Sequence, residues 1–192
     1  MPRPLIDNRR ERILDAAEAL VLDRGFDAMS VARVAERAEI GKGAVYLEFA
    51  SKHDILDGVL TRATARLQAR VDAELGIRPS LSAAYRAAAR ALLADELMSA
   101  AFLDDRGILG SHVDAVADGR YRARHRSVVA WLCELERRDA LADGVNPEHL
   151  AIALSSATIG LLSAARIIGP LTPAQLEGAI ETFAHMVAVY ER

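Results

Sequence analysis

The sequence predicts an all-α protein built from two helical domains, with about nine helices in total. Of its 192 residues, 52% are hydrophobic, and alanine and leucine, which are strong helix formers, are the main contributors. Hydrophobic residues recur at spacings of three and four, the period of a half-buried helix. Segments that alternate polar and apolar residues, as strands do, are nearly absent. These observations together favour helices throughout.

The first elements are a long helix and two short ones. A helix is expected from about Asp7 to Arg24, with Gly25 as a left-handed stop. Ser30 then offers its side-chain oxygen as the N-cap of a second helix, to about Ala38. A turn over residues 39–41 leads into a third helix, from Lys42 to Phe49. Such a helix-turn-helix domain of three helices can place its third helix in the major groove of DNA.

A fourth helix links this N-terminal unit to the rest of the chain. Ser51 begins a Ser-x-x-Asp capping pattern at its start. Gly76 and Pro79 break the helical pattern, and they mark the best candidate boundary. We expect two domains, over residues 7–67 and 68–192, with the fourth helix bridging them.

The C-terminal part reads as a helical bundle. Helices are expected over about 81–97 and 119–140. Asn146 followed by a proline starts a further helix, which Gly169 ends. Thr172 starts the last helix with a Thr-x-x-Gln capping box.

The open face of the third helix is the expected DNA-binding surface. If Val45 and Phe49 point into the core, the residues between them face outward near the helix N-terminus. A lysine there can neutralise a phosphate or reach a guanine, a tyrosine hydroxyl can bind a phosphate, and a leucine can touch a thymine methyl group. The expected DNA contacts are Ser30, Lys42, Gly43, Ala44, Tyr46, Leu47 and Lys52.

Residues from Ile13 to Leu56 resemble the N-terminal signature of TetR-type transcriptional regulators. The matching positions are Ser30-Val31, Val34-Ala35, Ala38, Lys42 to Tyr46, Phe49 and Ser51-Lys52. The resemblance implies a ligand-responsive repressor that binds a palindromic operator on double-stranded DNA as a homodimer. It also implies that a small molecule releases the protein from DNA, and that the protein is not an enzyme.

Four positions differ from the commonest pattern of that family. Glu39 stands where glycine is frequent, and Gly41 stands where serine usually caps the recognition helix. Ala44 lacks the hydroxyl often found there for a phosphate contact. Glu48 should repel phosphate unless it is turned away. Binding is therefore expected to depend on Lys42, Tyr46 and Lys52.

The last two helices are the expected dimer interface. Residues 150–165 include no charged side chain, and apolar residues surround the helix on all sides. Two such helices per subunit can form a two-fold four-helix interface, and the alternative is that they are only the buried centre of a monomer. The expected interface residues are Leu154, Leu161, Ile180, Phe183 and Val187.

The middle helices are expected to enclose a cavity for a small-molecule effector, as the resemblance implies. Candidate wall residues are Tyr85, Phe102, Trp131 and Cys133, although residues of these types are also common in ordinary helical cores.

Charge and composition restrict the remaining possibilities. The net charge is −3, and residues 1–54 carry nine basic against ten acidic side chains, so DNA contact must come from a few placed donors. Cys133 is the only cysteine, which excludes an intramolecular disulfide and fits a cytoplasmic protein. The sequence contains neither an apolar signal core nor an apolar run long enough to span a membrane.

Other residue groups have less specific patterns. The basic run over residues 120–126 could bind an anion, but it also fits a solvated helix face. Asp104, Asp105, His112 and Asp114 lack a recognised metal-site spacing, so neither a metal nor a cofactor is expected. A small metal-dependent helical enzyme and a helical protein-interaction module are the alternative classes of function.

Overall fold

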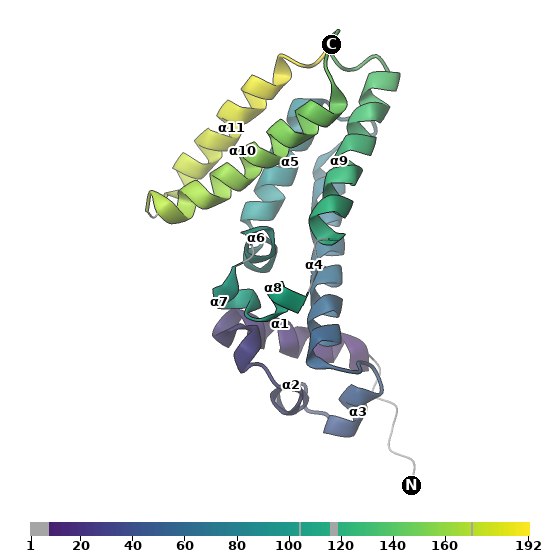
Figure 1. The fold of residues 1–192 in the computed structure, drawn as a ribbon, viewed down its shortest axis with the longest axis vertical. Coiled ribbons are helices and arrows are strands. Elements are labelled where there is room, and N and C mark those ends of the chain that lie inside the picture. Colours follow the sequence, from purple (N-terminus) through teal and green to yellow (C-terminus); the bar gives the residue numbers. More distant parts are fainter. Residues whose placement is uncertain (1–7, 104, 116–118, 170) are drawn as a thin grey trace. The chain divides into compact units, whose positions relative to one another are not determined.

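The computed structural model describes residues 8–103, 105–115, 119–169 and 171–192 (Figure 1). These residues form helices joined by short turns and one isolated β-bridge between Leu141 and Glu191, which confirms the all-α prediction. Nine of the helices in these ranges have five or more residues, and two more have four residues each. Among the described helices none is both long enough and apolar enough to cross a bilayer.

The described residues divide into two compact units. The first comprises residues 8–65 with 96–103 and 105–115, and the second comprises residues 66–95 with 119–169 and 171–192. Residues 96–116 therefore group with the N-terminal unit, although the sequence analysis assigns them to the second domain. The helices of the first unit are α1 (Arg9–Ala28), α2 (Val31–Arg37), α3 (Lys42–Tyr46), the start of α4 (Lys52–Glu74), α6 (Glu96–Leu103), α7 (Arg106–Leu109) and α8 (His112–Ala115).

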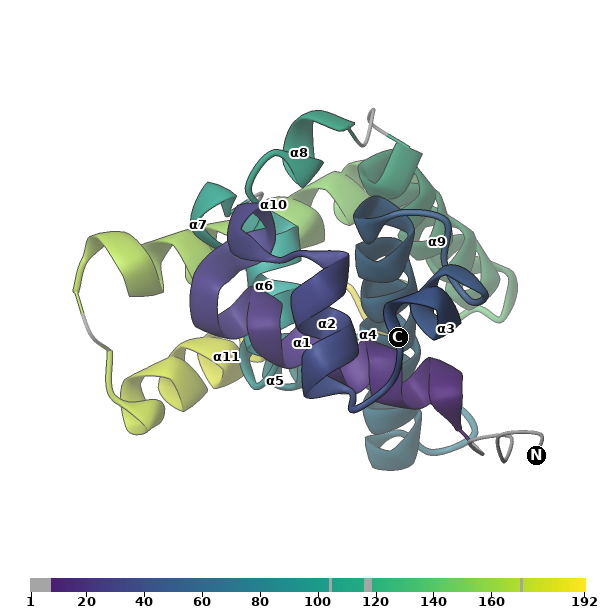
Figure 2. The same ribbon diagram turned by 90° about the horizontal axis from the view of Figure 1, so that it is seen from below.

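Local backbone preferences set the turns of the first unit. Gly25 interrupts α1 with a φ of 74°, at the position where the sequence predicts a stop. The Ser30 side chain caps α2 by accepting a hydrogen bond from the Arg33 N–H at 3.3 Å. Glu39 has a φ of 53°, which explains why glycine is the more common residue there. These turns let α2 pack across α1, with α3 following at the same end of the unit (Figures 1 and 2).

A single apolar core holds the first unit together. Val45 of α3 is fully buried and Phe49 is 5% exposed, so both point inward as predicted. On the rim of this core, Arg62 of α4 contacts three carboxylates of α1, at 2.6–3.0 Å. Other fully buried members of the core are Ile13, Ala17, Val21, Phe26, Val34, Ile55, Leu56, Val59, Ala63 and Leu109.

The segment from Asp105 to Ser111 is joined closely to the end of α1. A Cβ atom at Gly25 would lie 2.5 Å from the Gly107 carbonyl oxygen, so the two backbones touch there. The carboxylate of Asp27 accepts hydrogen bonds from the Ser111 N–H and hydroxyl. Both hydrogen bonds lower the pKa of Asp27.

The second unit contains the end of α4 and four further helices, α5 (Leu81–Leu93), α9 (Gly119–Arg137), α10 (Pro147–Ile167) and α11 (Pro173–Ala188). In this unit α11 packs on α5 and α10 packs on α9, while α10 and α11 lie side by side (Figure 1). The predicted caps are present. The Asn146 side chain accepts from the His149 N–H at 3.0 Å, and Thr172 with Gln175 forms a complete capping box.

Candidate nucleic-acid interface

A hollow of about 500 Å³ lies where α2, α3 and α4 begin. Lys42 of α3 and Lys52 of α4 line it, together with the N-cap residue of α2. These two lysines are the only lysines in the chain, whose other cationic residues are arginine and histidine. The other lining residues are Met29, Ser30, Val31, Ala32, Tyr46, Ala50 and Ser51.

The outer face of α3 is open to solvent. Tyr46 is 51% exposed and Leu47 is 77% exposed, whereas the preceding residue, Val45, is fully buried in the core. The Lys42 ammonium lies 5.9 Å from the centre of the Tyr46 ring. A Cβ atom at Gly43 would meet nothing within 4 Å, so the surface beside these side chains is unobstructed. The edge of a DNA groove can therefore reach α3 without any rearrangement of the side chains around it.

Lys52 is held in place by its neighbours. Its ammonium lies 4.3 Å from the centre of the Phe26 ring and donates a hydrogen bond to the Phe26 carbonyl oxygen at 3.5 Å. The first turn of α4 is fixed by Ser51, whose hydroxyl accepts from the Asp54 N–H at 3.1 Å. This lysine is thus ordered at the rim of the hollow before any ligand binds.

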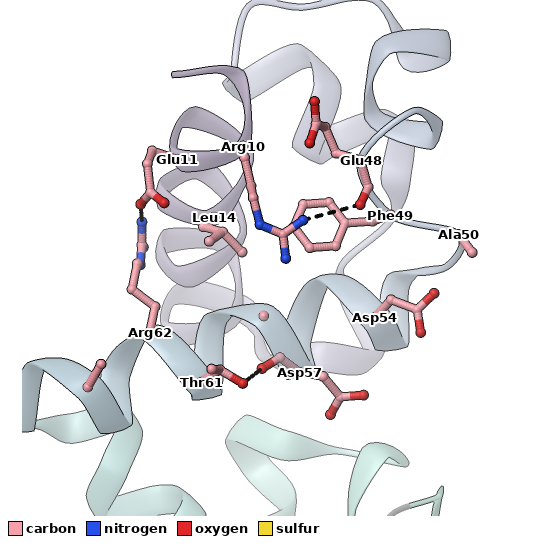
Figure 3. A pocket seen from close by; sticks show the side chains of 12 residues that line it. Arg10, Glu11, Leu14, Glu48, Phe49, Ala50, Asp54, Asp57, Thr61 and Arg62 are labelled. Carbon is pink, nitrogen blue, oxygen red and sulfur yellow. Dashed lines mark hydrogen bonds and ion pairs between the residues drawn. The ribbon is translucent and has the colours of Figure 1, made fainter. Parts of the chain in front are cut away.

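Glu48, which the sequence analysis expects to repel phosphate unless turned away, is compensated by a cation. Its carboxylate lies 3.7 Å from the Arg9 guanidinium and is about one quarter exposed. The neighbouring Arg10 stacks on the Phe49 ring at 4.3 Å and donates to the Glu48 carbonyl oxygen (Figure 3). The negative charge of Glu48 is therefore partly neutralised on the face that carries α3.

A second hollow, on the side of α1 and α4, has the opposite character. Its volume is about 590 Å³, and Figure 3 shows Glu11, Asp54 and Asp57 around it, with Arg62 bonded to the first of them. Phosphate would meet several carboxylates there, so this hollow does not suit a nucleic-acid backbone.

The structure places the predicted DNA-contacting residues at one end of the first unit. Five of the seven are well exposed, while Ala44 and Lys52 are half-buried. Five further residues shape the hollow but are not among the expected DNA contacts, because nothing in their spacing separates a groove wall from an ordinary helix end. They are Met29, Val31, Ala32, Ala50 and Ser51.

The four candidate effector residues belong to different packing groups. Tyr85 is buried among α5, α10 and α11 in the second unit, and the neighbouring α9 carries half-buried Trp131 and Cys133. Phe102 lies on α6 of the first unit and is half-buried. Of the four, only Tyr85 is buried, with 7% of its surface exposed.

The candidate dimer residues divide by exposure. Leu161, Ile180 and Val187 are each less than 10% exposed and pack inside the subunit's own core. Leu154 and Phe183 are half-buried. The large apolar residues that α10, α11 and the turns after them expose are Ile152, Ile159, Ile167, Ile168, Met186, Val189 and Tyr190.

The remaining residue groups are described only in part. Asp105 caps α7 by accepting from the Gly107 N–H at 2.8 Å, and His112 faces His53. Asp104 and the Asp114 side chain lie outside the described residues, as do the side chains of Arg120, Tyr121 and Arg124 in the basic run. Over the described part of the chain, no three His, Cys, Asp or Glu side chains are arranged to hold a metal ion.

Comparison with known proteins agrees with this geometry. Residues 13–59 match the family model described as bacterial regulatory proteins, tetR family. The repressor KstR of Rhodococcus jostii is 36% identical over 114 residues, which are 56% of this chain and 54% of that protein. The chain thus spans about half the length of this curated relative.

Solved structures share the fold over nearly the whole chain. NemR of E. coli in its reduced form has a TM-score of 0.66 at 22% identity, covering 94% of this chain and 97% of its own. A TetR/AcrR-family regulator from Thermobifida fusca has a TM-score of 0.66 at 20% identity, with the same coverage. KstR is a transcriptional repressor by name, in line with the prediction that the chain is not an enzyme.

Proposed function

We propose that the whole chain is a ligand-responsive transcriptional repressor of the TetR type, because residues 13–59 match the family model of bacterial regulatory proteins, tetR family, and KstR is similar over 114 residues. In this proposal it binds a palindromic operator as a homodimer in the cytoplasm, and a small molecule releases it. The assignment of residues 7–67 to DNA binding and residues 68–192 to sensing and dimerisation is part of the proposal.

One observation carries the DNA-binding role. Both lysines of the chain line the same hollow, beside an exposed tyrosine and leucine on α3. Lysine side chains and helix N-termini bind phosphate, whereas exposed side chains on a helix that enters the major groove read base edges. Lys42 and Lys52 are therefore proposed to hold the DNA backbone, and Leu47 to contact bases.

The repressor role rests on the relatives. KstR is named a transcriptional repressor, and its match with this chain extends beyond the helix-turn-helix to 114 residues. Repression by occupancy needs only tight operator binding in the absence of ligand. Release then requires that the effector bind better to a conformation in which the two recognition helices are wrongly spaced.

The homodimer is proposed to form through α10 and α11. Ile152 on α10 and Met186 on α11 are each more than half exposed, and Ile159 is 39% exposed. A second copy related by two-fold symmetry can bury these side chains in a four-helix interface. The buried residues Leu161, Ile180 and Val187 support these helices from inside the subunit, while Leu154 and Phe183 are proposed at the edge of the interface.

The effector is proposed to bind around Tyr85 in the second unit, with Trp131 and Cys133 of α9 as further wall residues. The Tyr85 ring packs 6.2 Å from that of Phe183, and burial raises the pKa of its hydroxyl. Among the described residues the buried Tyr85 hydroxyl has no hydrogen-bond partner, and the Thr158 hydroxyl nearby donates to the Leu154 carbonyl oxygen, so two hydroxyls lie in an otherwise apolar region. An apolar effector with one polar group would fit this chemistry.

The DNA-binding proposal is tested by selecting binding sites from random double-stranded DNA with the full chain. A palindrome is expected, because two recognition helices must meet successive major grooves. Fluorescence anisotropy on the selected duplex then compares three variants across a salt titration. Lys52→Ala should weaken binding to all sequences and reduce the salt slope by about 1, whereas Leu47→Ala should change base preference.

Arg70→Ala is the matched control, since Arg70 is an exposed cation on α4 in the second unit. It should leave both affinity and salt slope unchanged. Equal salt slopes for the wild type and Lys52→Ala would contradict the proposed role of this lysine, and recovery of no enriched sequence would contradict operator binding itself.

A further inference from the structure

The turn between α2 and α3 contains a left-handed residue that is not glycine. The Glu39 N–H donates to the Glu36 carbonyl oxygen at 3.1 Å. The Ile40 N–H donates to the Ala35 carbonyl oxygen at 3.0 Å. With Ala38 as the C-cap, these two hydrogen bonds form a complete Schellman motif. Its left-handed position is Glu39, whose φ of 53° is unfavourable for any residue that has a Cβ atom.

The helix that follows this turn begins without a side-chain cap. Gly41 is the N-cap of α3, and it has no side chain that could accept a hydrogen bond from the first turn. The helix itself has only five residues, which is too short for a helix to be stable without outside support. The position of α3 therefore depends on the turn before it and on the groups that hold this turn.

Arg12 of α1 holds the turn from outside. Its guanidinium donates to the Ala38 carbonyl oxygen at 2.6 Å and lies 3.5 Å from the Glu39 carboxylate. The last carbonyls of a helix have no partner within the helix and carry a partial negative charge, so a cation is favourable there. The contact with the Ala38 carbonyl is partly buried, whereas the Glu39 side chain is 85% exposed. The hydrogen bond to the backbone is therefore the stronger of the two contacts.

A second arginine of α1 makes the same kind of contact at the end of α3. Arg10 donates to the Glu48 carbonyl oxygen at 3.4 Å, and its guanidinium lies 4.3 Å from the centre of the Phe49 ring (Figure 3). The first turn of α1 thus supplies a cation to the C-terminal ends of both short helices. Of the two contacts, that of Arg12 is the shorter and the less exposed.

We propose that Arg12 is a positioning residue for DNA binding. Its guanidinium stabilises the left-handed turn at Glu39, and the turn fixes the orientation in which α3 presents Tyr46 and Leu47 to solvent. Because this guanidinium is already bound to the turn, Arg12 acts through the position of α3 and not as a ligand of phosphate. The inference rests on the proposed function, in which α3 is the recognition helix.

Hydrogen–deuterium exchange of the full chain tests the support of the turn without DNA. The Glu39 and Ile40 amides, which donate within the Schellman motif, report its opening. Their protection should fall about tenfold in Arg12→Ala, because a hydrogen bond from a charged donor shifts an equilibrium by at least that factor. The amides of residues 55–59 in the buried part of α4 should keep their protection, since the core stays folded. Unchanged protection at Glu39 and Ile40 would overturn the proposal.

Glu39→Gly tests the link between the arginine and the left-handed residue. Glycine adopts a positive φ without strain, so the turn should no longer need the guanidinium. When Glu39→Gly is added to Arg12→Ala, protection of the Ile40 amide should return to within about threefold of the wild type. A double variant that exchanges as fast as Arg12→Ala alone would contradict this link and overturn the proposal.

DNA binding is then measured by fluorescence anisotropy on the selected duplex across a salt titration. Arg12→Ala should weaken binding by about threefold or more, because only molecules with a closed turn are competent to bind. The salt slope should stay that of the wild type, and Glu39→Gly should restore the affinity. Loss of a phosphate contact would instead lower the slope by about 1 and would not be restored by glycine. That result would overturn the positioning role.

Arg24→Ala is the matched control, since Arg24 is an exposed arginine at the other end of α1, paired with its neighbour Asp23 at 2.9 Å. It should leave protection, affinity and salt slope unchanged. If protection falls in Arg12→Ala while affinity does not, the turn does not position α3 for DNA, and the proposal is wrong. If the wild type binds no duplex, the proposed function fails and the positioning role with it, whereas the exchange result still shows whether Arg12 holds the turn.

Discussion

At the scale of single residues, Gly25 occupies a position that another residue could not fill without strain. Its φ is 74°, and a Cβ atom would lie 2.5 Å from the backbone oxygen of Gly107. Gly25→Ala should lower the free energy of unfolding by roughly 1–3 kcal/mol, because both the backbone conformation and the contact with Gly107 become unfavourable. Urea denaturation followed by circular dichroism measures this.

Gly43→Ala is the control for that substitution. Gly43 is inside α3, and a Cβ atom there meets nothing within 4 Å. The variant should be as stable as the wild type or more stable by up to about 1 kcal/mol, since alanine is the better helix former. Equal losses in the two variants would show that Gly25 is not specially constrained.

The Asp27 carboxylate makes the stability of the first unit depend on pH. The hydrogen bonds from the Ser111 side chain and backbone lower its pKa below the usual value of 3.8. A lowered carboxyl pKa stabilises the folded state above the unfolded-state pKa, and this stabilisation is lost as the pH falls toward the folded-state pKa. Asp27→Asn should remove this part of the pH dependence.

The measurement is the urea midpoint of both proteins between about pH 5 and pH 3, below the range in which histidines titrate. The difference between wild type and Asp27→Asn should shrink steadily as the pH falls. A difference that is constant over this range would show that the Asp27 charge does not contribute to the link with Ser111.

At the scale of elements, the capping box of α11 shows what one helix end contributes. The Thr172 hydroxyl accepts from the Gln175 N–H at 3.3 Å, and the Gln175 side chain accepts from the Thr172 N–H at 2.8 Å. Thr172→Ala should destabilise the second unit by about 1 kcal/mol. Thr182→Ala on the same helix should change stability by less than about 0.5 kcal/mol, because that threonine is exposed and caps nothing. Thermal unfolding of both variants checks this.

Local elements of this kind could be predicted from the sequence. The Ser30 and Thr172 caps, the stop at Gly25 and the inward direction of Val45 all follow from short-range chemistry, and the structure agrees with them. The exposed face of α3 was also predictable, because an inward Val45 fixes which neighbours on a short helix point outward.

Contacts between distant segments could not be predicted in the same way. His53 and His112 are 59 residues apart, and neither stands in a pattern that implies the other. Residues 96–116 pack with the first unit because Gly107 and Ser111 meet the end of α1, and no local signal encodes that contact. Helical spacing also does not separate a residue buried in its own subunit, such as Ile180, from one left for a partner, such as Ile152.

At the scale of the whole molecule, the exposed apolar residues of α10 and α11 lead to a test of assembly. Ile152→Glu should convert a dimer into folded monomers, because each subunit would bury a charge in place of an isoleucine. Burial of one isoleucine side chain contributes about 1.5–3 kcal/mol, and a two-fold dimer buries one from each subunit. The dimer dissociation constant should therefore rise at least about hundredfold.

Ile77→Glu is the matched control, since Ile77 is 99% exposed in the turn after α4. Light scattering at micromolar concentration should give a dimer for this variant and a monomer for Ile152→Glu. A dimer in both cases would place the interface elsewhere on the molecule.

The restriction of lysine to Lys42 and Lys52 has a practical consequence. A reagent specific for primary amines finds side-chain targets only at the rim of one hollow, because every other cationic side chain is arginine or histidine. Among side chains, a fluorophore or cross-linker attached through an amine therefore labels only the candidate DNA face, and the α-amino group of the chain is the other primary amine that it can modify. Protection of these two amines by a bound duplex would give a footprint of that face at single-residue resolution.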